Sequence, residues 1–223
     1  MADSNSQRKL IFKSFIYLGL LFYLGYSLFI QDTNELSNQI RDEIVSSKSI
    51  IPTEQWQAVT KNAELTFNYL ANDLGMVEYL NRVLVPEVKD IEQSEKGFNL
   101  AAGMFMSFFY TAAKNIPLLV FQSIYRWHLV LGWLFVFLPF IAALIIDGMY
   151  QWKLKRYVFG NVTIQFYRVW LKGFWLIGWL TLIYLLMPNM SLFNNIAQLF
   201  PPLALFILGI ALNRLWSNYQ KLM

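Results

Sequence analysis

The 223-residue chain is 57% hydrophobic and 17% aromatic, and only 14% of its residues are charged. One water-soluble core of that size cannot bury so much apolar side chain, so the composition favours an integral membrane protein. The chain has no cysteine and a single histidine, His128, which excludes a disulfide framework, a catalytic thiol and a histidine–cysteine zinc site. We therefore expect an all-α polytopic membrane protein without a cofactor.

Four apolar segments approach or reach the roughly 20 residues that a helix needs to cross a membrane. The first, residues 11–30, follows a short N-terminal stretch of residues 1–10. A cleaved signal peptide is the alternative there, but the apolar run exceeds the roughly 7–15 residues of a signal core. The other three predicted spans are residues 129–146, 174–187 and 201–215. Pro139 predicts a kink in the second span.

Residues 31–127 separate the first span from the second and are predicted to be helical. Apolar residues recur at helical spacing in two stripes, namely Leu36, Ile40 and Ile44, and then Trp56, Val59, Ala63, Phe67 and Leu70. Residues 98–113 are apolar but short for a crossing, and Lys114, Asn115 and Pro117 interrupt the sequence that follows. We expect a helix that lies on the outer membrane surface or packs on the external domain, with a fifth crossing as the alternative.

The distribution of charge predicts how the chain is oriented. Residues 31–127 hold eight basic and twelve acidic residues, whereas the remainder holds ten basic and two acidic residues. Because lysine and arginine accumulate on the cytoplasmic side, both termini are predicted to be cytoplasmic and residues 31–127 periplasmic. Residues 128–223 then form a three-helix membrane domain with a cytoplasmic hairpin at residues 150–172.

No group of residues predicts an enzyme. His128 is expected at the outer membrane boundary, where an amphipathic side chain needs no catalytic explanation. The predicted cores of spans two to four contain no ionisable residue, which disfavours ion-coupled transport. Cations and aromatic residues in the hairpin are also ingredients of a single-strand nucleic-acid surface. The positive-inside rule explains them without such a ligand, so direct nucleic-acid contact is disfavoured.

Asp147 is the one acid at the inner boundary of the second span, about one turn inside it. Its carboxylate is expected to reach the headgroups or to pair with a cation, for which Lys153, Arg156 and Arg168 are the candidates. Such a pair would hold the cytoplasmic hairpin against the second span, which is a structural role.

The order of segments from LPFIAALIIDGMYQWKLKRYVFGN through FYRVWLK, LIYLLMP and FPPLALFILGIAL to WSNYQKLM resembles the C-terminal half of a membrane-protein family. That family occurs in integrating conjugative elements and conjugative plasmids. The resemblance covers about residues 116–223, whereas residues 31–97 share little with the family beyond being helical. Matching positions are Pro139, Asp147, Gly148, Arg156, Gly160, Tyr167, Tyr184, Pro188, Tyr219 and Lys221. Arg168 departs from the family pattern, which has a histidine after the tyrosine.

The resemblance implies a non-enzymatic inner-membrane component or accessory of a conjugative type IV secretion system. Its partners would be membrane lipid and other secretion proteins in a hetero-oligomeric complex, with the coupling ATPase as the leading candidate. The residues expected to serve interaction or structure are Asp147, Gly148, Lys153, Arg156, Tyr167 and Arg168. A small transporter or channel that acts alone is the alternative, and a membrane-tethered nucleic-acid binder is a third hypothesis.

Overall fold

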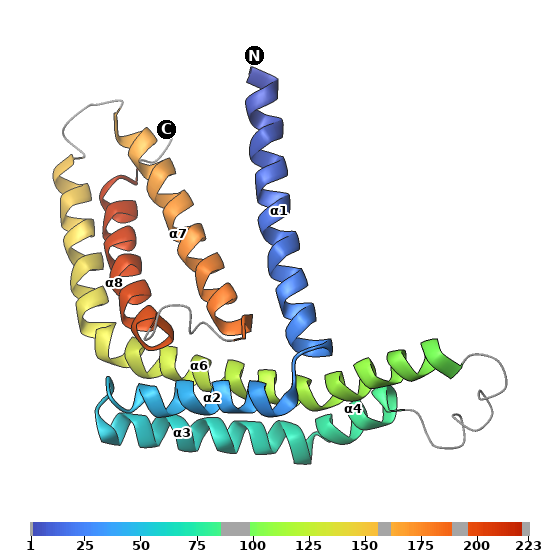
Figure 1. The fold of residues 1–223 in the computed structure, drawn as a ribbon. Coiled ribbons are helices and arrows are strands. Elements are labelled where there is room, and N and C mark those ends of the chain that lie inside the picture. Colours follow the sequence, from blue (N-terminus) through green and yellow to red (C-terminus); the bar gives the residue numbers. More distant parts are fainter. Residues whose placement is uncertain (1, 86–98, 156–161, 189–195, 220–223) are drawn as a thin grey trace. The chain divides into compact units, whose positions relative to one another are not determined.

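The computed structural model describes residues 2–85, 99–155, 162–188 and 196–219, and these residues are helical apart from short turns (Figure 1). The elements are α1 (Ala2–Phe29), α2 (Thr33–Ser47), α3 (Thr53–Asn68), the π-helix η1 (Tyr69–Asp73), α4 (Met76–Leu84), α6 (Asn99–Lys155), α7 (Val162–Leu186) and α8 (Ile196–Ser217). The predicted all-α fold is confirmed.

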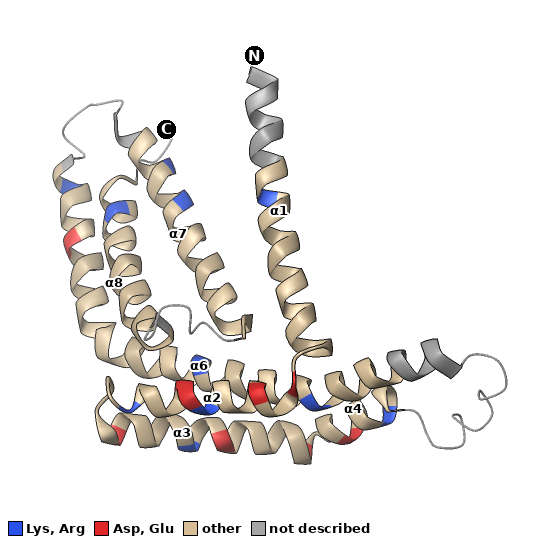
Figure 2. Cartoon of the chain, in the orientation of Figure 1, with Lys and Arg blue, Asp and Glu red and all other residues tan. Residues whose placement is uncertain are grey.

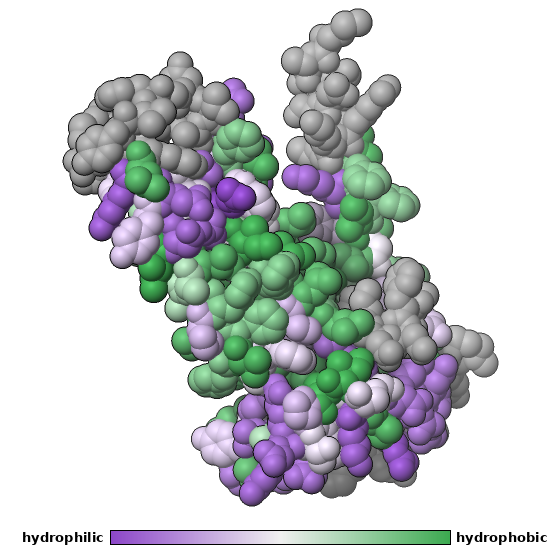
Figure 3. Space-filling model, turned by 90° about the vertical axis from the view of Figure 1, so that its left-hand side faces the viewer, coloured by the Kyte–Doolittle hydropathy of each residue, from purple (hydrophilic) through white to green (hydrophobic). Residues whose placement is uncertain are grey.

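Four of the described helices are long and apolar enough to cross a membrane, as the sequence predicted. The candidate spans are Ile11–Phe29 in α1, Met106–Leu154 in α6, Gln165–Leu186 in α7 and Ala197–Ser217 in α8. Few side chains in the most apolar windows of these spans are buried, and in the middle of the view in Figure 3 the exposed side chains are mainly hydrophobic. Lipid or other apolar helices are the environments that suit such surfaces.

Helix α6 is continuous over 57 residues, where the sequence predicted a short helix over residues 98–113 and a separate span over residues 129–146. At 1.5 Å per residue, 57 residues make about 85 Å of helix measured along its path, so the roughly 30 Å hydrocarbon layer accommodates only part of it. The predicted interruption at Asn115 is absent because this side chain is fully buried and hydrogen-bonded to neighbouring helices. A buried side-chain amide whose hydrogen bonds are satisfied can lie within a packed helix, so the helix continues through Asn115.

The contacts divide the chain into two compact units. The first consists mainly of residues 1–45 and 61–124, and the second of residues 46–60, 125–186 and 190–223. Helices α2, α3 and α6 each contribute residues to both units.

The core of the first unit forms where α2 and α3 pack against the N-terminal half of α6. Leu36 and Ile40 of α2 are buried with Leu119 of α6, which explains the first apolar stripe. Phe67 of α3 meets Phe121 edge to face, with ring centroids 5.3 Å apart. Helix α6 therefore packs against α2 and α3 around Leu119 and Phe121, and the expected placement of residues 98–113 on the membrane surface or on the external domain stays a prediction.

Asn115 fixes the junction between α1 and α2 in the first unit. Its Nδ2 donates to the carbonyl oxygens of Ser27, at 2.9 Å, and Gln31, at 3.0 Å. Thr33 at the start of α2 donates its hydroxyl to Asn115 Oδ1 at 2.8 Å. The last carbonyl groups of a helix have no N–H partner within the helix. The amide of Asn115 on α6 supplies hydrogen-bond donors to carbonyl groups at the end of α1.

The second unit contains α7, α8 and the C-terminal part of α6. Phe140 of α6 stacks on Phe206 of α8, with ring centroids 5.6 Å apart, and further along both helices Leu144 lies against Gly209. These contacts advance in the same direction along both helices, so α6 and α8 are parallel. Their C-terminal ends therefore lie at the same end of this unit (Figure 1).

Candidate functional site

The residues singled out at the end of the second span lie where α6 meets α8. Asn213 of α8 donates from Nδ2 to the carbonyl oxygen of Leu144 and to Asp147 Oδ2, both at 2.8 Å. Gln151, one turn after Asp147, donates to the same carboxylate oxygen at 2.7 Å. A side-chain amide has two hydrogens to donate, so Asn213 alone makes both bonds to α6.

Gly148 allows the two helices to approach this closely. A Cβ atom at this position would lie 2.7 Å from the Asn213 carbonyl oxygen and 3.1 Å from Trp216 Cβ. The first distance is to backbone, so α8 itself would have to move. Small residues at helix crossings let backbones come together in membrane proteins. We refer to Asp147, Gly148 and Asn213 together as the α6–α8 clamp.

The expected ion pair of Asp147 is not found in the described part of the chain. Neither Lys153 nor Arg168 pairs with it there, and Arg156 lies outside the described residues. The carboxylate accepts amide N–H groups instead. The amides bind its Oδ2 without the cost of desolvating a second charge, which a guanidinium next to an apolar helix would incur.

The remaining predicted residues are not part of the clamp. Tyr167 of α7 meets Tyr219 with ring centroids 6.2 Å apart. Lys153 and Arg168 are exposed, and the ammonium of Lys153 lies 5.7 Å from the centroid of the Tyr150 ring. Of the predicted residues, the structure therefore places Asp147 and Gly148 against Asn213 of α8 and leaves Lys153 and Arg168 at the surface.

Basic residues gather at the end of the second unit where the clamp lies. Figure 2 shows them towards the same end of α6, α7 and α8, and they are Lys153, Arg168, Lys172 and Arg214. Asp147 is the one acid on the described residues of these three helices within the unit. This end of the unit is therefore positively charged.

A second polar group joins the same three helices. Arg126 of α6 is fully buried, donates through Nη1 to the carbonyl oxygen of Tyr184 on α7, and lies 5.0 Å from the centroid of that tyrosine ring. The Tyr184 hydroxyl donates to the carbonyl oxygen of Ala197 on α8 at 2.7 Å. Phe200 stacks on Tyr184 with ring centroids 4.5 Å apart.

Sequence reasoning missed the roles of Asn213 and Arg126. The available signal at Asn213 was a single amide within the apolar run LGIALNRLW, because a polar side chain in a membrane helix usually bonds to a neighbouring helix. Among the described residues no three histidine, aspartate or glutamate side chains are grouped as a metal site would require. That the protein is not an enzyme stays a prediction.

A family model described as "IncC plasmid conjugative DNA transfer protein DtrJ-like" matches residues 31–220. The match confirms the predicted conjugative-transfer family. It also shows that the expectation for residues 31–97 was wrong, since the family includes this helical region as well as the three-helix part. No curated protein and no solved structure matches the chain. Because the match covers most of the sequence, this protein belongs to the DtrJ-like family of IncC plasmid conjugative DNA transfer proteins.

Proposed function

We propose that the protein is a non-enzymatic component or accessory of a conjugative type IV secretion system in the inner membrane. In this proposal it supports DNA transfer by holding other membrane proteins in place, and the coupling ATPase is its leading partner. The observation that carries the proposal is membership of a conjugative DNA transfer family in a chain with four candidate membrane spans.

Helix α1 supports a role in assembly. Only 6% of its candidate span is buried, and large side chains such as Phe15 and Phe22 are 76% and 73% exposed. A helix that is apolar on most sides is stable in lipid, and it can also pack against the spans of other proteins. We assign α1 to such contacts with neighbouring membrane subunits.

The basic end of the second unit is the surface that we assign to the coupling ATPase. It combines Lys153, Arg168, Lys172 and Arg214 on three adjacent helices. The positive-inside rule supports a cytoplasmic position for this end, together with both termini. A cytoplasmic partner with an acidic surface would be attracted there and oriented by charge.

The first unit offers a different surface. Tyr69, Leu74, Tyr79 and Val83 are exposed on and around η1 and α4. Single π-helical turns often occur at functional sites. We assign this apolar surface to contacts with periplasmic parts of the machinery.

Deletion of the gene in the donor cell, together with a flux assay, distinguishes this proposal from a transporter or channel that acts alone. We expect transfer to fall and to recover when the intact gene is supplied in trans. Liposomes that contain only this protein should show no solute flux. Flux that disappears on changing Asp147, at unchanged protein abundance, would instead establish a transporter.

Reporter fusions test the proposed orientation. A reporter active only in the cytoplasm should be active at both termini, and one active only in the periplasm should be active within residues 48–52, between α2 and α3. Termini on opposite sides of the membrane would remove the basis for a cytoplasmic docking surface.

A further inference from the structure

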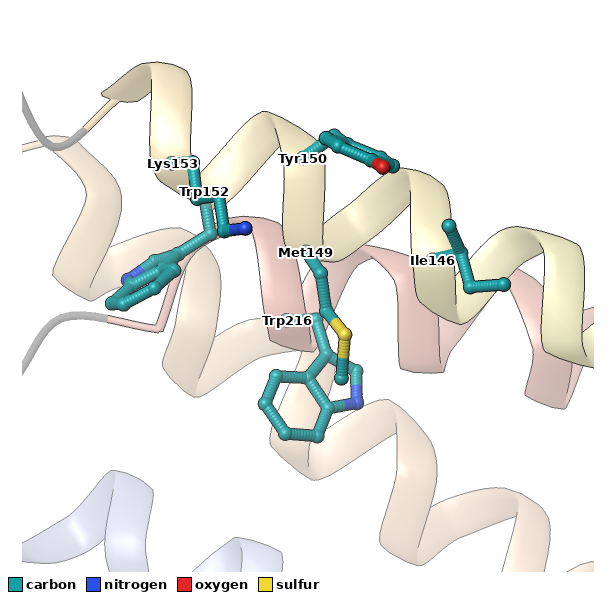
Figure 4. Close-up of a pocket in the computed structure, with 6 residues that line it drawn as sticks. All are labelled: Ile146, Met149, Tyr150, Trp152, Lys153 and Trp216. Carbon is teal, nitrogen blue, oxygen red and sulfur yellow. The ribbon is translucent and has the colours of Figure 1, made fainter.

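A pocket of about 300 Å³ opens between the C-terminal ends of α6 and α8 (Figure 4). Its walls are mainly apolar and aromatic, and they are formed by Ile146, Met149, Tyr150, Trp152, Lys153 and Trp216. Figure 4 shows Met149 of α6 directed towards Trp216 of α8. Of the four cations assigned to docking the coupling ATPase, Lys153 lines the pocket, whereas Arg168, Lys172 and Arg214 do not.

The pocket lies where two candidate spans end. The span in α6 ends at Leu154, and the span in α8 ends at Ser217. Lys153 and Trp216 each precede one of these last residues. Tryptophan, tyrosine and lysine are favoured at the level of the lipid headgroups, because their apolar parts face the hydrocarbon and their polar ends reach water. The pocket is therefore at headgroup depth.

The polar groups of the pocket favour an anion. Lys153 is exposed and forms no ion pair within the described ranges. The tyrosine hydroxyl and the two indole N–H groups are further donors. The carboxylate of Asp147 does not line the pocket, and its Oδ2 accepts hydrogen bonds from the amides of Asn213 and Gln151.

We infer that this pocket binds one anionic phospholipid, with the phosphate next to Lys153 and the upper part of an acyl chain against Met149 and Trp216. Charge complementarity and depth together select this occupant. An acidic peptide would match the charge, but it would gain less from a largely apolar pocket at headgroup depth. The inference does not depend on the proposed role in docking the coupling ATPase.

Native mass spectrometry of the full-length protein in mild detergent tests this inference. The protein is titrated with phosphatidylglycerol and, separately, with phosphatidylcholine of the same acyl chains. We expect retention of one phosphatidylglycerol in preference to phosphatidylcholine. Lys153→Gln should weaken this binding by about fivefold, the effect expected from one cation beside an anionic lipid surface. Excess inorganic phosphate should not displace the lipid, because it lacks the acyl chain.

Two further variants locate the site. Lys172→Gln removes the same charge from an exposed position on α7, outside the pocket, and should leave phosphatidylglycerol binding close to that of the unaltered protein. Met149→Trp should fill the pocket and reduce binding without a change of charge. Equal retention of the two lipids, equal effects of the two lysine variants, or undiminished binding to Met149→Trp would each overturn the inference.

Discussion

Asn115 in the first unit and Asn213 in the second are both buried and both join helices, but they differ in what they bind. Asn115 binds carbonyl oxygens at the end of α1, where no helical partner exists. Asn213 binds a carbonyl oxygen inside α6 and the exposed carboxylate of Asp147. Without Asn115, the carbonyls lose a donor that they cannot replace within the helix. Without Asn213, Asp147 can turn to water. The first junction should therefore be the more sensitive to substitution.

Asn115→Leu is expected to have the largest effect. It keeps the branching and the number of non-hydrogen atoms of the side chain but leaves the carbonyl oxygens of Ser27 and Gln31 buried without this donor, which costs about 3 kcal/mol. The midpoint of thermal unfolding in detergent should fall by several degrees. Asn62→Leu changes an exposed residue of α3 and should have little effect. Equal midpoints for the two variants would show that the α1–α2 junction does not depend on this side chain.

Gly148→Ala should follow, because the added Cβ forces α8 away from α6 and overpacking costs about 1–3 kcal/mol. Gly178→Ala in α7 is the matched control, since nothing lies within 4 Å of its Cβ position. Alanine is also the better helix former by about 1 kcal/mol. Thermal unfolding in detergent should therefore give a lower midpoint for the first variant and an unchanged or higher one for the second. If both variants lost stability, the loss would come from the substitution within each helix and not from a clash between α6 and α8.

Asn213→Leu should cost about 1 kcal/mol, less than the change at Asn115. The peptide carbonyl of Leu144 keeps its helical partner, and Asp147 remains hydrated. Cysteines placed at Leu144 and Gly209 should cross-link less readily in this variant, since the chain has no native cysteine to interfere. Unchanged cross-linking and unchanged stability would mean that apolar packing alone holds α8 on α6.

Asp147→Asn should have the smallest effect, below about 0.5 kcal/mol, because the replacement keeps an acceptor for the amides of Asn213 and Gln151. An ion pair would behave differently, since removing one charge would leave the other without its partner. Thermal unfolding of the single variants and of the Asp147→Asn/Arg156→Gln double variant separates the cases. If the effects of the two substitutions on stability were strongly coupled, Asp147 and Arg156 would form the ion pair that the sequence suggested.

The sequence was most informative where side chains repeat at regular intervals. The stripe of Leu36 and Ile40 predicted the face of α2 that is buried, and the four apolar segments predicted the candidate spans. Periodicity reports which face of a helix is apolar. It does not report which polar side chain on a distant helix will satisfy that helix's end.

For this reason the roles of Asn115 and Asn213 were not predicted. In the sequence Asn115 looks like an interruption, yet its hydrogen bonds join residues more than eighty positions apart. Asp147 was identified as unusual, but its partner was sought among cations because charge is the strongest attraction visible in a sequence. The neutral amide of Asn213 is favoured by position alone, through the close approach that Gly148 permits.

Co-purification from donor membranes in gentle detergent tests the central proposal most directly. The unaltered protein should bring down other membrane components of the transfer machinery, with the coupling ATPase among them. The Arg168→Glu/Lys172→Glu variant should reach the membrane in equal amount but lose the coupling ATPase, because its basic end is reversed in charge. Recovery of the unaltered protein without any transfer component, in donors whose DNA transfer does not need it, would contradict the proposal.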